Sequence, residues 1–200
     1  MATYLPPVEK PRGLLLKLVY FLTRRQFGKV ATPIAVFSAR MPTAFLTYYG
    51  KVSRLDNKLQ LPRTTRVLVR ERVSTLNGCA YCMDTTRWYA LRESPEDVVR
   101  LDALDEYRTS PLFTDAQRAA LDYATELVTD RRVRAETFDQ LARYHSEREI
   151  CDIAWLVASE HLYNMTNIGL NIGSDGLCEL PSVAKGANRT AAQKTAESHH

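Results

Sequence analysis

The sequence predicts an all-α fold of about eight helices, and three observations support this prediction. Apolar residues recur at helical spacing along most of the 200 residues, whereas strand-like alternation does not persist over any segment. Two patterns typical of capping boxes, Thr114 to Gln117 (TDAQ) and Ser146 to Glu149 (SERE), stand before apolar runs. Proline and Asn-Gly breaks separate the other periodic segments.

The first half of the chain predicts five helices. The apolar stretch GLLLKLVYFL begins the first helix, and Pro42 and Pro62 stand before the second and third. The Asn77-Gly78 pair ends the third helix, and Pro95 stands in the first turn of the fifth. In chain order, the predicted helices cover residues 12–26, 43–54, 62–76, 80–92 and a short segment from 94.

The second half predicts three further helices. The first follows the capping pattern at Thr114, and the segment AETFDQLARYH forms the second. The third is the long run ICDIAWLVASEHLYNMTNIGLNI, which ends near Gly173. Because this run is apolar nearly all round, we expect it to be the central buried helix.

Composition and charge narrow the class of protein. The chain carries 27 Lys and Arg against 23 Asp and Glu, and its two densest basic runs are short, so we expect no nucleic-acid partner. No stretch reaches the roughly 20 apolar residues of a membrane span, and Lys17 interrupts the N-terminal apolar stretch. That stretch also lacks a cleavage site, so we expect no membrane partner and a cytoplasmic, reducing compartment.

We expect one domain with two additions. Residues 1–29 are predicted to form an N-terminal amphipathic helical extension, and residues 30–180 the main domain. Residues 181–200 are polar and aperiodic, so we expect a disordered tail. The terminal His-His pair is typical of a purification tag, so it is not counted among the candidate site residues.

The stretch LNGCAYCMDTTRW holds two cysteines three residues apart. The Asn-Gly break places Cys79 at a helix start and Cys82 in its first turn. Unpaired N–H groups and the helix dipole stabilise a thiolate there, which suits a dithiol that cycles with a disulfide. A thioredoxin fold is not indicated, because both flanks of the motif predict helices.

The CxxC pair has three other interpretations. Structural zinc needs four ligands, and Cys151 and Cys178 stand alone as core or helix-end residues. Haem attachment needs His directly after Cys82, where the chain has Met83. Two small buried residues without chemistry are also consistent with the pattern. We predict neither a metal nor a cofactor.

The motif and its surroundings resemble a known family. The stretch RVSTLNGCAYCMDTTRWYAL, the segments PIAVFSARMPTAFLTYYGKV and LPRTTRVLVRERVS, and the later helices are similar to the alkylhydroperoxidase AhpD-like, or carboxymuconolactone decarboxylase, superfamily. The resemblance covers about residues 30–175. It implies an AhpD-like helical domain with CxxC at a helix N-terminus, reduction of a peroxide or small disulfide, and a protein dithiol as reductant. It also implies a homo-oligomer, either a dimer, a trimer or a hexamer.

The resemblance implies a proton relay with the pattern E–x11–CxxC–x3–H. Carried onto this chain, Cys82 is the thiol that attacks peroxide, and Cys79 donates a proton and closes the disulfide. The Glu position is Val67 and the His position is Thr86. Neither side chain titrates near neutral pH, so we expect a weakened site.

Three side chains are candidates to replace the relay. Glu71 lies one helical turn after Val67. His161 lies in the long helix, where a hydrogen-bonded core histidine is the alternative, and Arg87 offers a positive charge unless it is a surface residue. Asp84 would raise the pKa of a nearby thiol, and we expect His145 to be a surface cap.

We therefore predict a weak thiol oxidoreductase that reduces peroxides or disulfides. The alternative is a catalytically inactive scaffold or redox-sensing protein of the same family. The decarboxylase branch, which acts on a carboxylated lactone, does not need the cysteine pair. We also expect self-association, because Leu14, Leu15, Leu18 and Phe21 need a partner surface unless they pack on their own domain.

Overall fold

The computed structural model describes residues 2–179, apart from the side chains of residues 46–48, and it confirms the all-α prediction. These residues form eight α-helices together with short π- and 3-10-helical segments, and they contain no strand. The predicted tail at 181–200 lies outside the described residues. The α-helices are α1 (Leu14–Phe27), α2 (Gly50–Asp56), α3 (Arg63–Asn77), α4 (Ala80–Glu93), α5 (Pro95–Asp102), α6 (Asp115–Asp130), α7 (Ala135–Ala142) and α8 (Glu147–Gly169).

Both predicted capping boxes are confirmed. At the start of α6, the Gln117 backbone N–H donates to Thr114 Oγ1 (3.2 Å), and the Thr114 N–H donates to Gln117 Oε1 (3.0 Å). Ser146 and Glu149 make the same reciprocal pair at the start of α8. Each box satisfies backbone donors that the first turn of a helix leaves free.

The segment between α1 and α3 differs from the prediction. A π-helix, η1 (Ile34–Ser38), was not predicted, and the predicted helix 43–54 is a π-helix, η2 (Ala44–Tyr49), that continues into α2. A search for the 3.6-residue period does not detect π-helices, whose hydrogen bonds join residues five apart. Such segments occur frequently at functional sites.

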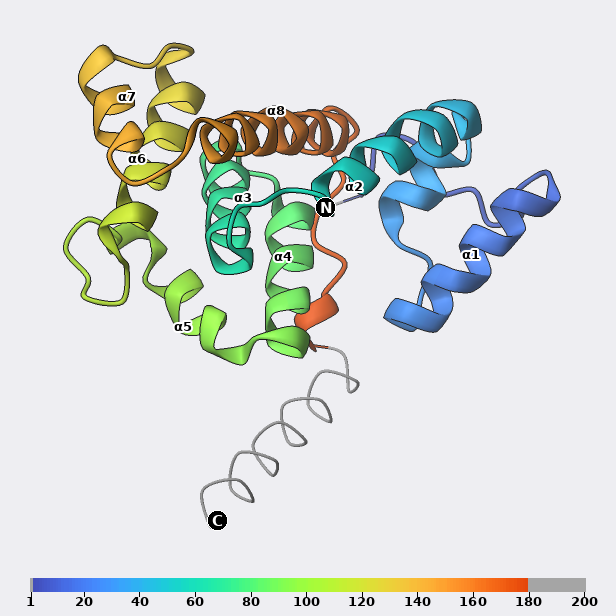
Figure 1. Ribbon diagram of the computed structural model, residues 1–200. Helices are drawn as coiled ribbons and strands as arrows, with labels where there is room; N and C mark the ends of the chain where they lie inside the picture. The colour runs from blue at the N-terminus through green and yellow to red at the C-terminus, as the bar shows by residue number, and fades with distance from the viewer. Residues whose placement is uncertain (1, 180–200) are drawn as a thin grey trace, which may run out of the picture.

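The core is centred on α3 and not, as the apolar run predicted, on α8. Helix α3 contacts α4, α5, α6 and α8, and α8 crosses over one end of α3 and α4 (Figure 1). Val69 and Val73 of α3 pack with Ile153 and Leu156 of α8 in the largest buried cluster. The other face of α8 is open, and Met165 is 48% exposed. The helix also ends at Gly169, before Gly173, since Asn171 adopts a left-handed backbone conformation (φ 53°).

Helix α1 and the π-helical segments lie at one end of the molecule, and α6 and α7 lie at the other (Figure 1). Phe27 of α1 packs against Trp88 of α4, with ring centroids 4.8 Å apart. The opposite face of α1 leaves large apolar side chains uncovered in the monomer, namely Leu14, Leu15, Leu18 and Phe21. None of the helices built from residues 2–179 has the length and apolar character to span a bilayer.

A candidate dithiol site

The two cysteines of the CxxC motif lie at the start of α4, as predicted. Gly78 adopts the left-handed conformation (φ 72°) that ends α3, and Cys79 is the N-cap residue of α4. The sulfur atoms of Cys79 and Cys82 are joined in a disulfide, with Cα atoms 5.3 Å apart. The tight turn therefore presents both cysteines at the positive end of the helix dipole.

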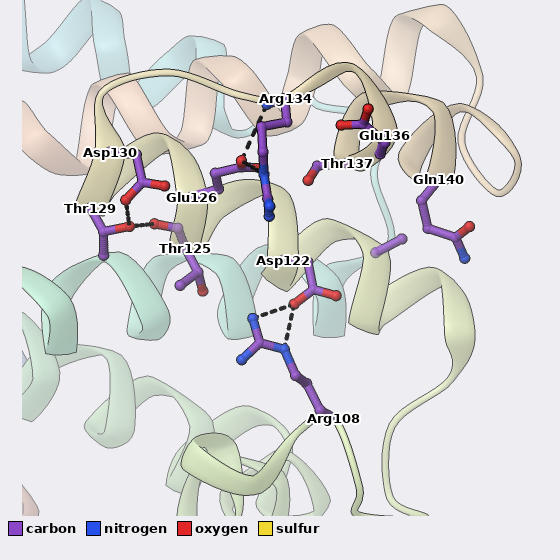
Figure 2. A pocket seen from close by; sticks show the side chains of 11 residues that line it. Arg108, Asp122, Thr125, Glu126, Thr129, Asp130, Arg134, Glu136, Thr137 and Gln140 are labelled. Atoms are coloured by element: carbon purple, nitrogen blue, oxygen red, sulfur yellow. Dashed lines mark hydrogen bonds and ion pairs between the residues drawn. The ribbon is translucent and has the colours of Figure 1, made fainter.

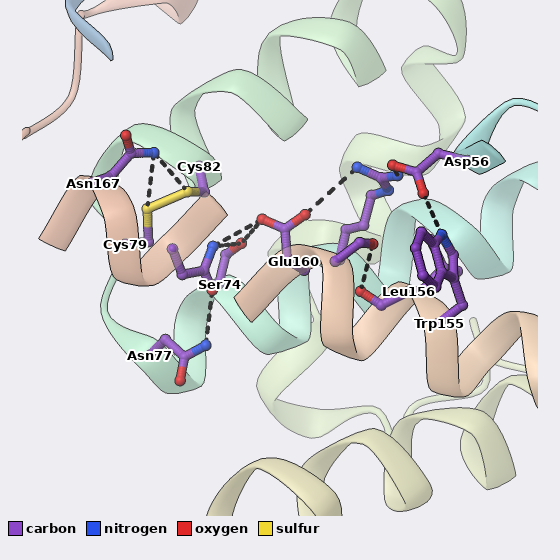
Figure 3. A network of polar contacts seen from close by, with 12 residues as sticks. Asp56, Ser74, Asn77, Cys79, Cys82, Trp155, Leu156, Glu160 and Asn167 are labelled. Atoms are coloured by element: carbon purple, nitrogen blue, oxygen red, sulfur yellow. Dashed lines mark hydrogen bonds and ion pairs between the residues drawn. A yellow bond between two sulfur atoms is a disulfide. The ribbon is translucent and has the colours of Figure 1, made fainter. Parts of the chain in front are cut away.

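An asparagine from α8 contacts both sulfur atoms. Asn167 Nδ2 donates to Cys82 Sγ at 3.4 Å and to Cys79 Sγ at 3.8 Å (Figure 3). The Asn167 side chain is itself buried. Sequence reasoning missed this residue, although Glu160, Asn164 and Asn167 recur at i, i+4 and i+7 within an apolar run, and that spacing places them on one helix face.

A cavity of about 590 Å³ opens onto the pair. Cys82, which is 6% exposed, lines this cavity, whereas Cys79, which is 1% exposed, does not. The two positions of the missing relay, Val67 and Thr86, both line it as well. The other walls come from η1, η2, α2 and α8, and their aromatic members are Phe37, Phe45, Tyr49 and Tyr163. The positions that the family resemblance assigned to the relay thus face the same space as Cys82.

A buried carboxyl group, Glu160 of α8, also lines the cavity. It accepts hydrogen bonds from Ser74 Oγ (2.9 Å) and Asn164 Nδ2 (2.8 Å), and it lies 3.5 Å from the Arg70 guanidinium. Burial raises the pKa of Glu160, although the charge of Arg70 acts in the opposite direction.

The polar network continues from Arg70 away from the sulfur atoms. Arg70 pairs with Asp56 at 2.7 Å, and Asp56 accepts a hydrogen bond from Trp155 Nε1 at 2.7 Å (Figure 3). Three helices, α2, α3 and α8, are therefore joined by a continuous polar chain along the cavity. Sequence analysis did not predict this network, because its members lie far apart along the polypeptide.

Glu71, the first predicted replacement for the relay, does not line the cavity. Its Oε2 atom is buried and has no hydrogen-bond partner among the described residues. Burial, with a smaller contribution from the nearby Glu160, raises the pKa of Glu71 to about 8. Glu71 is thus a partly buried acid that holds its proton at neutral pH and does not face the cavity that Cys82 lines.

His161 and Arg87 are not brought to the cavity either. His161 Nδ1 lies 3.1 Å from Asn77 Nδ2, and burial lowers the pKa of its imidazole, with a smaller contribution from Arg131. Arg87 forms an ion pair with Asp102 at 2.6 Å on the surface. His161 is therefore hydrogen-bonded but only partly buried, so it is not a core histidine, and Arg87 is the surface arginine of the alternative interpretation.

Asp84 anchors the segment that follows α8. It accepts hydrogen bonds from the backbone N–H groups of Asp175 (3.0 Å) and Leu177 (3.0 Å) and from Ser174 Oγ (2.8 Å). Burial acts to raise the pKa of Asp84, but the hydrogen bonds from Leu177, Ser174 and Cys178 outweigh it, and the pKa lies below its usual value. The carboxylate therefore holds a chain segment in place, a role that the sequence did not suggest.

The expectation for His145 is corrected: it was expected at the surface but is buried, and its Nε2 lies 2.9 Å from the Ala116 carbonyl. Cys151, expected as a core or helix-end residue, is exposed near the start of α8. Cys178, given the same two alternatives, is partly buried in the short segment η4 (Leu177–Glu179), where it packs against a buried cluster with its Sγ 3.5 Å from the Asp84 carbonyl oxygen. No three His, Cys, Asp or Glu side chains within residues 2–179 gather as metal ligands.

A second cavity, of about 440 Å³, lies between α6 and α7. Its walls are polar, and two ion pairs, Arg108 with Asp122 and Arg134 with Glu126, cross it (Figure 2). No cysteine or histidine lines this second cavity. Of these two cavities, the one that Cys82 lines is therefore the candidate for redox chemistry.

Comparison with known proteins places this geometry in context. Residues 39–126 match the model of the carboxymuconolactone decarboxylase family. The chain is 32% identical over 180 residues to the uncharacterised Escherichia coli protein YnjA, and the match covers 88% of this chain and 97% of the relative.

Solved structures share the fold at lower identity. The debrominase Bmp8, solved as a variant in complex with 2,3,4-tribromopyrrole, is 22% identical, with a TM-score of 0.75 over 94% of this chain and 98% of its own. An AhpD-core protein from Ralstonia eutropha JMP134, described as peroxidase-related, is 20% identical, with a TM-score of 0.68 over 86% of this chain and 95% of its own. These similarities concern the fold.

Proposed function

Because the chain belongs to the carboxymuconolactone decarboxylase family, we propose that it is a thiol oxidoreductase that reduces peroxides or disulfides through Cys79 and Cys82. One observation carries the proposal. A disulfide at a helix N-terminus has one sulfur on the wall of a cavity and the other buried behind it. This arrangement suits a dithiol in which one thiol meets the substrate and the other resolves the product.

The chemistry divides the work between the two sulfur atoms. In the reduced protein, the Cys82 thiolate attacks the terminal oxygen of a hydroperoxide and the O–O bond breaks. That oxygen stays on sulfur, so Cys82 becomes a sulfenic acid, and the alkoxide takes up a proton and leaves as an alcohol. The Cys79 thiol then attacks the Cys82 sulfur, which releases water and forms the disulfide. With a disulfide substrate, Cys82 forms a mixed disulfide and Cys79 displaces the second thiol. A dithiol reductant returns the pair to the reduced state.

Glu160 is the group we assign to the transfer of protons within the cavity. Val67 and Thr86 cannot carry protons near neutral pH, whereas the buried Glu160 carboxyl has a raised pKa and lines the same cavity as Cys82. Its Ser74 partner belongs to the turn that precedes Cys79, since the Cys79 N–H donates to the Ser74 carbonyl at 2.9 Å. Glu160→Gln, which keeps the size of the side chain, is expected to flatten the pH profile of turnover.

The experiment that tests the function is peroxide consumption with dithiothreitol and cumene hydroperoxide. We expect turnover by the native protein, the same turnover by Cys151→Ser, and only the uncatalysed rate by Cys82→Ser. Cys151 is the matched control because it is an exposed cysteine outside the cavity. Equal rates for the native protein and Cys82→Ser would end the proposal of an enzyme.

An inactive redox-sensing protein is the main alternative, and the side chains at Val67 and Thr86 favour it. This alternative predicts that mild peroxide removes two thiols from the reduced protein as an intramolecular pair, without turnover. A count of free thiols beside the turnover assay distinguishes the two functions. A loss of thiols without continued consumption of peroxide supports the sensor.

A second candidate activity is reductive dehalogenation, and the aromatic walls of the cavity favour it. Phe37, Phe45, Tyr49 and Tyr163 offer ring faces to a flat substrate, and the fold matches that of the debrominase Bmp8 over 94% of this chain. In this reaction an aryl bromide and two thiols give the dehalogenated ring, a disulfide and hydrogen bromide. Release of bromide from 2,3,4-tribromopyrrole by the reduced protein, and its loss in Cys82→Ser, is the test.

A further inference from the structure

The cavity that Cys82 lines contains three arginines on one face of α3. Arg63, Arg66 and Arg70 recur at i, i+3 and i+7, so their side chains project to the same side of the helix. Two of them already have carboxylate partners. Arg63 pairs with Glu93 (2.9 Å) and Arg70 with Asp56 (2.7 Å).

Arg66 differs from its two neighbours. Among the described residues it has no carboxylate partner, and its one hydrogen bond runs from Nη1 to the Asp56 carbonyl oxygen at 3.2 Å. The remaining N–H groups of its guanidinium, which presents five donors in a planar fork, are free to meet an anion. Arg66 thus supplies a positive charge without a carboxylate partner on the wall of this cavity.

The position of Arg66 along α3 gives its axial separation from the turn that leads to Cys79. The Cys79 N–H donates to the Ser74 carbonyl, so the disulfide lies level with the last turns of α3. Arg66 precedes Ser74 by eight residues, which corresponds to about 12 Å along the helix axis. The aromatic side chains of Phe37, Phe45 and Tyr49 line the same cavity.

From this arrangement we propose that the cavity binds an elongated aromatic or apolar acid, with its carboxylate on Arg66 and its other end at Cys82. The proposal rests on the proposed function for what happens at Cys82, but the binding itself needs no thiol chemistry. A planar carboxylate matches the guanidinium fork, and the aromatic rings that line the cavity offer apolar surface to the body of the ligand. The substrate class is then an acid that carries its reducible group within about 12 Å of the carboxylate, the axial separation given by the helix rise.

The carboxyl groups that line the cavity do not cancel the positive charge that Arg66 offers to an anion. Asp56 and Glu93 are held by Arg70 and Arg63, and burial favours the neutral form of Glu160. Arg66 is therefore the charge that a ligand meets unpaired.

The test uses the oxidised protein and the matched pair biphenyl-4-carboxylate and biphenyl-4-carboxamide, which share one shape and differ in charge. By isothermal titration calorimetry we expect the carboxylate to bind at least tenfold more tightly than the amide. The preference should disappear in Arg66→Gln and be partly retained in Arg66→Lys. Arg143→Gln is the control for net charge, because Arg143 is exposed, lies outside the cavity and forms no ion pair within residues 2–179.

Two results would overturn the proposal. Equal affinity of the native protein for the acid and the amide, or binding of neither at millimolar concentration, shows that the cavity does not select anions. An unchanged preference in a folded Arg66→Gln protein shows that Arg66 does not provide the selection. If Arg66→Gln does not fold, the comparison of acid and amide on the native protein still decides. Because the binding test uses the oxidised protein, its result does not depend on turnover. A protein without peroxidase activity can still prefer the acid, and an active enzyme can still show no preference.

Discussion

Replacing Asn167 by leucine removes the only side-chain donor to the two sulfur atoms among the described residues, while leaving a side chain of similar size. Asn167 Nδ2 lies 3.4 Å from Cys82 Sγ in the disulfide form, and we expect the same amide to favour the thiolate over the thiol in the reduced protein. A hydrogen bond to a charged group contributes about 1.5–3 kcal/mol, and 1.36 kcal/mol corresponds to a tenfold change in a protonation equilibrium. The loss of the amide should therefore reduce the thiolate fraction of Cys82 about 10- to 150-fold.

The rate of alkylation changes less than the thiolate fraction, because a more basic thiolate is a better nucleophile. With a Brønsted coefficient of about 0.4–0.5, roughly half of the effect on a logarithmic scale remains. We therefore expect Cys82 to react with iodoacetamide at pH 7 about 4- to 15-fold more slowly in Asn167→Leu than in the native protein. The assay follows the peptide that contains Cys82 by mass spectrometry after reduction, because Cys151 and Cys178 also react.

Thr166→Val is the matched control for this substitution. Thr166 precedes Asn167 on α8 and lines the same cavity, but its hydroxyl accepts a hydrogen bond from Tyr49 (3.0 Å) and does not contact sulfur. We expect its alkylation rate to stay within about twofold of the native value, since no contact to the charged group is lost. An unchanged rate in Asn167→Leu, or an equal loss in Thr166→Val, would refute the assignment of Asn167 as the donor that favours the thiolate.

Three other outcomes follow from the structure. Val67→Glu combined with Thr86→His is expected to increase peroxide turnover above either single variant, because both positions line the cavity with Cys82; turnover no higher than in the native protein would contradict this. The pKa of Glu71 rises from 4.5 to about 8 on folding, so the unfolded chain releases this proton at lower pH and the free energy of unfolding falls as pH rises through that range. Between pH 5 and pH 8, the free energy of unfolding measured in urea should fall by at least about 1 kcal/mol less in Glu71→Gln than in the native protein. The same pH dependence in both proteins would argue against the raised pKa of Glu71. Leu18→Glu with Phe21→Glu should lower the mass measured by light scattering if the exposed face of α1 is the surface for self-association, and a native protein that is already monomeric would exclude that.

Local signals predicted most of the fold. The capping boxes at Thr114 and Ser146 and the break at Gly78 are short-range features, set by hydrogen bonds within a few residues. The π-helical segments and the central position of α3 were not predictable in this way. They depend on which helices pack together, and an apolar run such as that of α8 does not reveal which of its faces remains open.

In the candidate site, too, the features set by neighbouring residues were predictable and those set by helix packing were not. The CxxC spacing identifies Cys79 and Cys82 from the sequence, and the turn that presents them depends only on neighbouring residues. Asn167 and Glu160 reach the site from α8, more than 75 residues later in the chain. The search for a substitute relay was directed to Glu71 because it lies one turn from Val67, but one turn rotates a side chain by about 40° around a helix of 3.6 residues per turn. That rotation, together with the packing of α3, takes Glu71 out of the cavity.

The burial of Cys79 constrains the order of events in the proposed cycle. A reductant that opens the disulfide must attack a sulfur it can reach, and only Cys82 lines the cavity while Cys79 is 1% exposed. The oxidant meets the same sulfur in the other half of the cycle. Both half-reactions then use one entrance and one atom, so oxidant and reductant exclude each other and must alternate, as in ping-pong kinetics. In such a scheme Cys79 needs no access of its own, because its partner is always the neighbouring sulfur, and its burial protects the resolving thiol from overoxidation.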